Sequence, residues 1–186
     1  MKRLVILTIG KTHSGKTTFA RALEQSLPES VVIDRDDIAE FINTHYRNML
    51  PQHGTNTLKD ALTRTIVDYA VHQSEQHLIL CNANRNKEGR LSLLDWFHQK
   101  GFVSILVYFD LPDEVLYSRI ASSQRSTAIL RKSASFDVVL NRQIADSQKG
   151  LAEPPTASEA EHLFVIRDSE EVPGTIEKIV QIAQSL

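Results

Sequence analysis

Residues 4–18 read LVILTIGKTHSGKTT, an apolar run followed at once by a stretch rich in glycine, lysine and threonine. The spacing of that stretch is G-x-x-x-x-G-K-[ST], which binds the phosphates of a nucleoside triphosphate. It is completed by Gly10, Gly15, Lys16 and Thr17. The apolar run predicts a short buried strand, and the residues after the motif have helical periodicity. The order strand, glycine-rich turn and helix predicts a phosphate-binding loop, called the P-loop below (residues 10–17).

The P-loop has the chemistry that a polyphosphate needs. Its glycines let backbone N–H groups close around an anion without interference from a Cβ atom. Lys16 is expected to be catalytic by reaching the β and γ phosphates, while the hydroxyl of Thr17 is expected to bind Mg²⁺. The N-terminus of the next helix adds a partial positive charge. The expected cofactors are ATP and Mg²⁺, and the expected nucleotide-binding set is Gly10, Lys11, Thr12, His13, Ser14, Gly15, Lys16, Thr17, Thr18 and Arg119.

Length and composition favour one soluble domain over residues 1–186. The formal net charge of −2 gives no overall attraction to nucleic acid, so a polynucleotide contact needs a local basic patch. The single cysteine, Cys81, excludes an internal disulfide framework and favours a reducing cytoplasm. No segment is long enough to cross a membrane, and the seven histidines lack metal-ligand spacing.

Apolar runs and helical segments alternate along the chain. Further strands are expected over 31–33, 78–81, 102–109 and 162–166. The expected helices cover 16–26, 38–44, 58–74, 87–100, 112–123, 136–149 and 175–185. This order predicts an α/β fold of three layers, a P-loop NTPase sandwich with about five parallel strands and helices on both faces. Trp96 and Phe97 are expected to pack on the sheet, and functional loops are expected after the strands' C-terminal ends.

An acidic stretch follows the second strand in the sequence VVIDRDDI. We expect Asp36 to accept the proton of an attacking hydroxyl as a general base. Asp34 is expected beside metal-bound water, and both carboxylates are candidate contacts to the substrate. The alternative is structural: Asp37 caps a helix that begins at Ile38, and the other carboxylates face solvent.

The third strand ends in ILCNANRN, where many P-loop proteins carry the Walker B aspartate. Here that residue is Asn82, whose amide can hold a water or a substrate hydroxyl but supplies no charge. Either Asp34 or Asp36 then compensates, or metal affinity is reduced. Asn82 and Asn84 are the candidate acceptor contacts from this loop. Asparagine also forms turns after strands, so a purely structural role stays open for Asn84.

Residues 119–135 are expected to form a small helical lid rich in basic side chains. Small kinases use arginines from such a lid to neutralise charge on the transferring phosphoryl group. Arg125, in the polar loop SSQRST, is the candidate for that catalytic role. Arg119 precedes it and is assigned to the nucleotide. The alternative for Arg125, Arg131 and Lys132 is a solvated basic helix end.

Five segments in this order resemble the small P-loop kinases that include the 5′-kinase domain of polynucleotide kinases, zeta-toxin-like and gluconate-kinase-like proteins among the wider group. They are LTIGKTHSGKTTFAR, IDRDDI, CNANRNKEGR, FDLPDEVLYSRIASSQR and LAEPPTASEAEHLFVI. The resemblance implies transfer of the γ-phosphoryl group of ATP to a hydroxyl, with an RNA or DNA 5′-end as the leading acceptor. It places the general base on Asp36 and the lid arginine on Arg125.

Two departures from that family bear on the acceptor. The position that carries an acceptor-binding arginine in polynucleotide kinases is Ala39, and the aspartate after the third strand is Asn82. The spacing Asp34-x-Asp36 also looks like shikimate and gluconate kinases, so a small metabolite is the alternative acceptor. A third hypothesis is an ATP-dependent switch with slow hydrolysis. A GTPase is disfavoured, because no N-K-x-D motif is present.

Overall fold

A five-stranded, wholly parallel sheet forms the centre of the computed structural model, which describes residues 2–51, 54–130 and 135–186. The strand order is β2-β3-β1-β4-β5. The strands are β1 (Arg3–Gly10), β2 (Ser30–Asp34), β3 (His77–Cys81), β4 (Phe102–Phe109) and β5 (His162–Ile166). β1 is the central strand, and its pairing with β4 extends from Arg3 opposite Phe102 to Gly10 opposite Phe109. The predicted fold class is confirmed.

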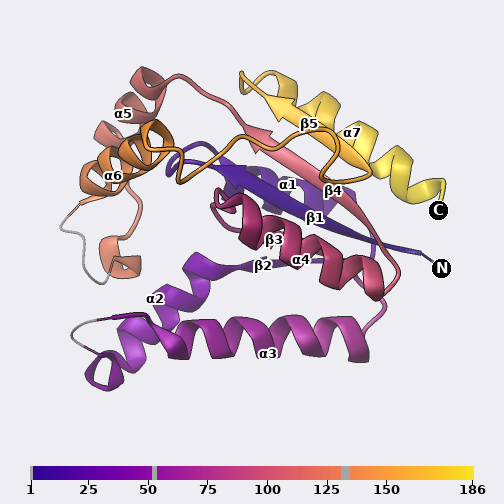
Figure 1. The fold of residues 1–186 in the computed structure, drawn as a ribbon, viewed down its shortest axis with the longest axis horizontal. Helices are drawn as coiled ribbons and strands as arrows, with labels where there is room; N and C mark the ends of the chain where they lie inside the picture. The colour runs from indigo at the N-terminus through magenta and orange to yellow at the C-terminus, as the bar shows by residue number, and fades with distance from the viewer. Residues whose placement is uncertain (1, 52–53, 131–134) are drawn as a thin grey trace.

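Helices cover both faces of the sheet, as Figure 1 shows. The helices are α1 (Lys16–Ser26), α2 (Arg35–His45), α3 (Thr57–Gln73), α4 (Lys87–Gln99), α5 (Asp113–Ala121), α6 (Phe136–Gln148) and α7 (Glu171–Gln184), with short 3₁₀ turns η1 (Arg47–Met49) and η2 (Thr127–Ile129). One apolar core contains side chains of α1 and α7, and the other contains side chains of α3 and α4. The molecule therefore has three layers.

Burial on both faces explains the sequence of the central strands. Leu4, Val5, Ile6 and Leu7 of β1 all have no exposed surface, so consecutive residues are apolar instead of alternating with polar ones. Phe97 of α4 is also fully buried, whereas Trp96 is only partly buried at the edge of the same core. No helix within the described residues is both long and apolar enough to span a bilayer.

The carboxyl ends of the strands meet at one end of the molecule. In Figure 1, α2, α5 and α6 gather there, while both chain termini lie at the opposite end. Parallel α/β sheets bind ligands at the carboxyl ends of their strands, so this arrangement positions the site. The segment expected to form the lid, 119–135, includes the end of α5 and the turn η2. Its residues 131–134, including Arg131 and Lys132, lie outside the described residues.

The start of α2 differs from the sequence expectation. The helix begins at Arg35, and its N-cap is Asp34 instead of Asp37. Asp34 has an extended backbone, with φ −97° and ψ 119°, and its Oδ1 accepts the backbone N–H of Asp36 at 2.8 Å. Asp37 instead pairs with Arg21 at 2.7 Å. The expectation that Asp37 caps this helix is therefore wrong, because apolar periodicity begins one turn after the cap.

Candidate active site

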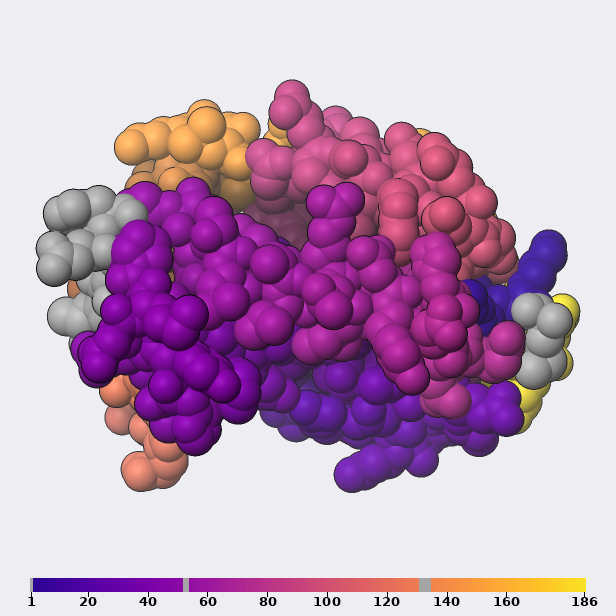
Figure 2. Space-filling model, turned by 90° about the horizontal axis from the view of Figure 1, so that it is seen from below, coloured from indigo at the N-terminus to yellow at the C-terminus, as the bar shows by residue number. Residues whose placement is uncertain are grey.

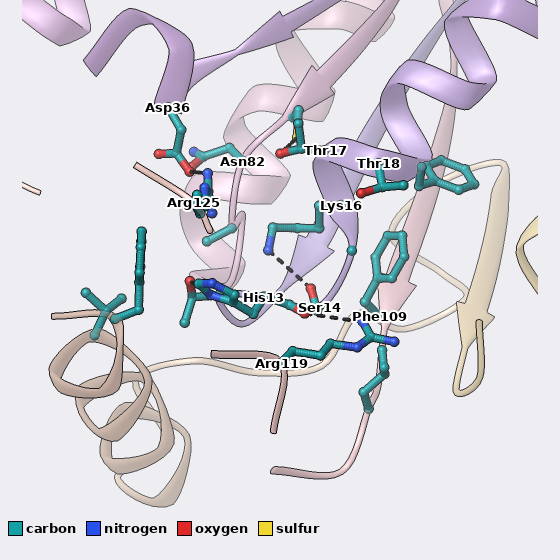
Figure 3. Close-up of a pocket in the computed structure, with 18 of the residues that line it drawn as sticks. His13, Ser14, Lys16, Thr17, Thr18, Asp36, Asn82, Phe109, Arg119 and Arg125 are labelled. Carbon is teal, nitrogen blue, oxygen red and sulfur yellow. Dashed lines mark hydrogen bonds and ion pairs between the residues drawn. The ribbon is translucent and has the colours of Figure 1, made fainter. Parts of the chain in front are cut away.

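A cavity of about 1000 Å³ opens at the carboxyl ends of the strands. Its wall combines the P-loop, both predicted carboxylates, the residues after β3, and side chains of the lid and α6. Figure 3 shows these side chains converging from separate elements. The cavity lining includes Lys16, Thr17, Asp34, Asp36, Asn82, Arg119 and Arg125. Seven residues from four predicted segments are therefore brought to one site.

The backbone of the P-loop is shaped as an anion cradle. Gly10 and Gly15 both have positive φ, at 155° and 99°. A Cβ atom on Gly10 would lie 2.9 Å from Ser14 Oγ and 3.0 Å from Phe109 Cβ, closer than side chains tolerate. Helix α1 begins at Lys16 with no side-chain cap and no acidic residue in its first turn. Its first N–H groups are thus left for an anion, which fits a bound phosphate.

The ammonium of Lys16 turns back into the P-loop. Its Nζ donates to the carbonyl oxygen of Lys11 at 2.5 Å and to Ser14 Oγ at 3.2 Å, as Figure 3 shows for Ser14. Burial lowers the pKa of Lys16 to about 8, although Cys81 and Asp36 act in the opposite direction. A desolvated ammonium held inside the loop gains from an arriving anion, since burial without a full counter-charge disfavours the charged form.

An oxygen-rich corner lies between the P-loop and β2. The hydroxyl of Thr17 donates to Asp34 Oδ2 at 2.9 Å, and the carboxylate of Asp34 is almost fully buried. Hydroxyl and carboxylate oxygens are the ligands that Mg²⁺ prefers, usually together with waters and substrate phosphates. The donor set fits that ion: Thr17 would hold it, and Asp34 would orient its hydration. Within the described residues no three histidines, cysteines or carboxylates gather as an all-protein metal site.

The predicted base and the predicted lid arginine lie against each other. Arg125 Nη2 donates to Asp36 Oδ2 at 2.8 Å, so the lid reaches across the cavity to α2 (Figure 3). The Arg125 guanidinium also lies 5.5 Å from the ring centroid of Phe136. A second cation, Lys59 of α3, places its Nζ 3.9 Å from Asp36 Oδ1. Two cations thus flank the one carboxylate.

Sequence reasoning did not find Lys59, because no motif marks it. Only the packing of α3 against α2 brings it to Asp36. Burial lowers the pKa of Lys59, while Asp36 opposes that effect. Ala39 is buried and cannot contact an acceptor. A positive charge near the expected base is therefore supplied by α3 and not by α2.

Arg119 and His13 connect the P-loop to its surroundings. Arg119 donates to the carbonyl oxygen of His13 at 3.3 Å and to Ser169 Oγ at 2.9 Å. His13 has a positive φ of 57°, and its Nε2 lies 3.0 Å from Ser123 Oγ in the lid. The ring of His13 packs edge-on against Phe136, with centroids 4.6 Å apart. His13 therefore joins the P-loop to the lid, a role that the motif alone does not indicate.

The two asparagines after β3 lie differently. Asn82 lines the cavity, whereas Asn84 has a φ of 44° and donates from Nδ2 to the carbonyl oxygen of Thr8 at 2.9 Å. The next residue towards β3, Ala83, accepts the backbone N–H of Gly10 at 3.0 Å. This loop is therefore fixed against the end of β1. Asn84 forms the turn that its residue type allows, and its carboxamide stays close to Asn82.

Comparison with known proteins places the fold in a family. Residues 5–153 match the family model AAA_33, described as an AAA domain. The chain belongs to the AAA_33 family. No curated protein matches this AAA_33 chain.

Solved structures similar to this AAA_33 protein share its fold over nearly their whole length. A Chloroflexus aurantiacus protein, described provisionally as a kinase, is 16% identical with a TM-score of 0.67, covering 97% of this chain and 98% of that chain. Chaetomium thermophilum Kti12, solved with ADP-AlF3, is 20% identical with a TM-score of 0.61, covering 94% and 96%. The APS kinase of Mycobacterium tuberculosis, solved with AMPPNP and APS, is 14% identical with a TM-score of 0.59, covering 98% and 98%. The AAA_33 chain has a P-loop kinase-like fold.

Proposed function

We propose that this protein is an ATP- and Mg²⁺-dependent kinase that transfers the γ-phosphoryl group of ATP to an alcohol hydroxyl. One observation carries the proposal: the carboxylate of Asp36 lies beside the lid arginine Arg125 in the same cavity as the P-loop lysine Lys16. A general base, a mobile cation and a phosphate cradle are the parts that phosphoryl transfer requires.

Each side chain takes one part of the reaction. Asp36 accepts the proton of the acceptor hydroxyl while that oxygen bonds to the γ-phosphorus. The bond from this phosphorus to the bridging oxygen of ADP breaks, and ADP leaves. Lys16 and Arg125 neutralise the charge on the phosphoryl oxygens. Thr17 would hold Mg²⁺ near Asp34, and the bound ion would supply further charge neutralisation.

The contact between Arg125 and Asp36 supports a closing step. Arg125 pairs with Asp36, and this ion pair occupies the proposed base. Arrival of a polyphosphate offers Arg125 a more negative partner. Movement of Arg125 from the carboxylate to the phosphoryl group frees Asp36 for the acceptor hydroxyl. Substrate binding and base activation are then coupled through one guanidinium.

Two classes of acceptor each have an observation in their favour. A small metabolite is supported by Lys59, which gives Asp36 a second cation inside the fold. An RNA or DNA 5′-end is supported by two exposed rings, Phe41 in α2 and Tyr46 just after its end, which are 50% and 44% exposed. Exposed aromatic rings can stack bases of a single strand. Both classes supply an alcohol hydroxyl, so the proposed chemistry is the same.

Transfer of labelled phosphate from γ-labelled ATP tests the proposal. The panel contains 5′-hydroxyl RNA and DNA oligonucleotides, nucleosides, polyols, and sugar or polyol acids, with Mg²⁺ present. A kinase labels an acceptor and consumes ATP faster when that acceptor is added. ATP turnover that no acceptor accelerates would support the slow ATP-dependent switch instead.

A further inference from the structure

A second cavity, of about 480 Å³, lies between α3 and α4 at the carboxyl ends of β2 and β3. In Figure 2, which views the molecule from below, a shaded recess separates the purple α3 from the rose α4. The cavity shares two wall residues, Cys81 and Asn82, with the cavity of about 1000 Å³ at the P-loop, which is called the nucleotide cavity below. The two cavities are therefore neighbours on either side of the loop after β3. A volume of this size is typical of a small-molecule site.

Arg35 lines this cavity, and one of its buried donors is unmet. Its Nη2 forms an ion pair with Asp60 of α3. Its Nε is buried, and it has no hydrogen-bond partner among the described residues. A buried N–H without an acceptor destabilises the folded state, so such groups call for a ligand or a water. A guanidinium with a free N–H matches the oxygens of a carboxylate or a phosphate.

The rest of the lining adds a second cation, amides and an aromatic wall. Arg64 of α3 lines the cavity, and its guanidinium has no ion pair within the described part of the chain. Asn82 and Asn84 add carboxamide groups that can hold hydroxyls, and Trp96 adds a flat apolar face. Two carboxylates also line the cavity: Asp60 pairs with Arg35, and Asp68 lies on an exposed position of α3, as Arg64 does.

We propose that this second cavity binds the carboxylate or phosphate of a small hydroxylated acceptor, with Arg35 and Arg64 holding the anion. The acceptor then extends past Cys81 and Asn82 and presents its hydroxyl to Asp36 in the nucleotide cavity. The assignment of the molecule as an acceptor rests on the proposed kinase function, whereas binding of the anion does not. A cyclic or polyhydroxylated acid fits the mixture of amides and an aromatic face.

The protein carries its own reporter of this site, because Trp96 is its single tryptophan. The P-loop is first saturated with AMPPNP and Mg²⁺, so that added anions do not bind there. Fluorescence of Trp96 is then followed while D-gluconate or inorganic phosphate is titrated, with D-glucose as the uncharged comparison. We expect saturable changes with both anions and none with glucose.

Two matched substitutions locate the effect. Arg35→Lys keeps a cation for Asp60 and removes the planar fork with its Nε donor, so the fold should survive. It should weaken anion binding about tenfold or more, the scale of a lost charged hydrogen bond. Arg47→Lys changes an exposed arginine of η1 outside both cavities and should leave the titration unchanged. Arg64→Gln, on an exposed position, gives an independent second loss of affinity.

The outcomes separate this inference from the kinase proposal. Saturable binding that Arg35→Lys weakens supports the site, even if no acceptor is phosphorylated. No fluorescence change with either anion, or equal titrations for the wild type and Arg35→Lys, overturns it. Phosphoryl transfer to an oligonucleotide end with unchanged kinetics in Arg35→Lys would uphold the kinase and reject the small anionic acceptor.

Discussion

Asp36 is the residue on which the proposed chemistry depends most directly. Replacing Asp36 by Asn keeps the size of the side chain but removes its basicity and its ion pair with Arg125. We expect transfer to fall by about a hundredfold or more, the scale of a lost general base. ATP affinity should change little, because the phosphate cradle is formed by other residues. Single-turnover transfer and equilibrium ATP binding measure the two quantities separately, and full transfer by the variant would remove Asp36 from the mechanism.

Two lysines of the site should have different roles, Lys16 in binding ATP and Lys59 in binding the acceptor. Lys16 lies inside the P-loop, whereas Lys59 approaches Asp36 from α3. Lys16→Met should raise the Kd for ATP by about tenfold or more, since a charged contact to the phosphates is lost. Lys59→Met should leave the Kd for ATP unchanged and raise the KM of the acceptor. Calorimetric titration with ATP and acceptor kinetics compare the two variants. Equal losses of ATP affinity in Lys16→Met and Lys59→Met would contradict these separate roles.

At the scale of elements, the starts of α2 and α7 were the features that the sequence predicted least well. Helix α7 begins at Glu171, four residues before the expected start, and includes Pro173 and Gly174 in its first turn. A proline near the start of a helix lacks an N–H that would be unpaired anyway, so Pro-Gly did not stop the helix. Strands β4 and β5 have the expected bounds, because a buried apolar run is a local signal. Caps depend on backbone geometry that periodicity does not encode.

The lid element makes two kinds of contact with α2, and they predict different phenotypes. Arg125 pairs with Asp36, whereas Asn43 only donates to the carbonyl oxygen of Ala128 in η2, at 2.7 Å. Arg125→Ala should lower kcat about 10³-fold, which is the lower end of the range for losing an arginine that neutralises charge on the transferring phosphoryl group. Asn43→Ala loosens the same lid without removing a charge, so kcat should fall far less. Steady-state kinetics compare the variants, and equal losses would mean that lid docking, not the Arg125 charge, limits turnover.

At the scale of the molecule, the sequence predicted the strands and the position of the P-loop but not the contacts between distant segments. The P-loop and its flanking elements are contiguous, so one window of sequence contains the whole signal. The approaches of Lys59 to Asp36 and of Arg35 to Asp60 join α2 to α3 across the chain. Nothing in the spacing of these residues encodes the packing of two helices. The second cavity was therefore unpredictable, although two of its lining residues, Asn82 and Asn84, were already candidates.

A buried ion pair between Arg90 and Glu159 stabilises the fold and also holds the loop after β3 at the site. Arg90 and Glu159 form two hydrogen bonds, at 2.7 and 3.1 Å, with side chains that are 0% and 3% exposed. Arg90 also donates to the carbonyl oxygen of Asn84 at 3.0 Å and to that of Glu153 at 3.3 Å. It thereby fastens the loop after β3 to the segment preceding β5. Burial alone would raise the pKa of Glu159, but hydrogen bonds from Arg90 and Thr156 outweigh it and hold that pKa below the usual value.

Breaking this pair should destabilise the whole molecule in a pH-dependent way. Glu159→Gln should lower the free energy of unfolding by about 3–5 kcal/mol at pH 7, since it leaves the Arg90 charge buried without its partner. Because the folded-state pKa of Glu159 lies below its unfolded value of about 4.5, the wild-type advantage is complete above that value. It is lost as pH falls through the lowered folded-state pKa. In urea unfolding from pH 7 to pH 3, the difference in the free energy of unfolding between the wild type and Glu159→Gln should therefore shrink as the pH falls.

Glu153→Gln is the control. It removes only an exposed pair with Lys87, so it should lower the free energy of unfolding by about 1 kcal/mol or less. A Glu159→Gln difference that stays constant down to pH 3 would mean that this carboxylate contributes packing and not charge.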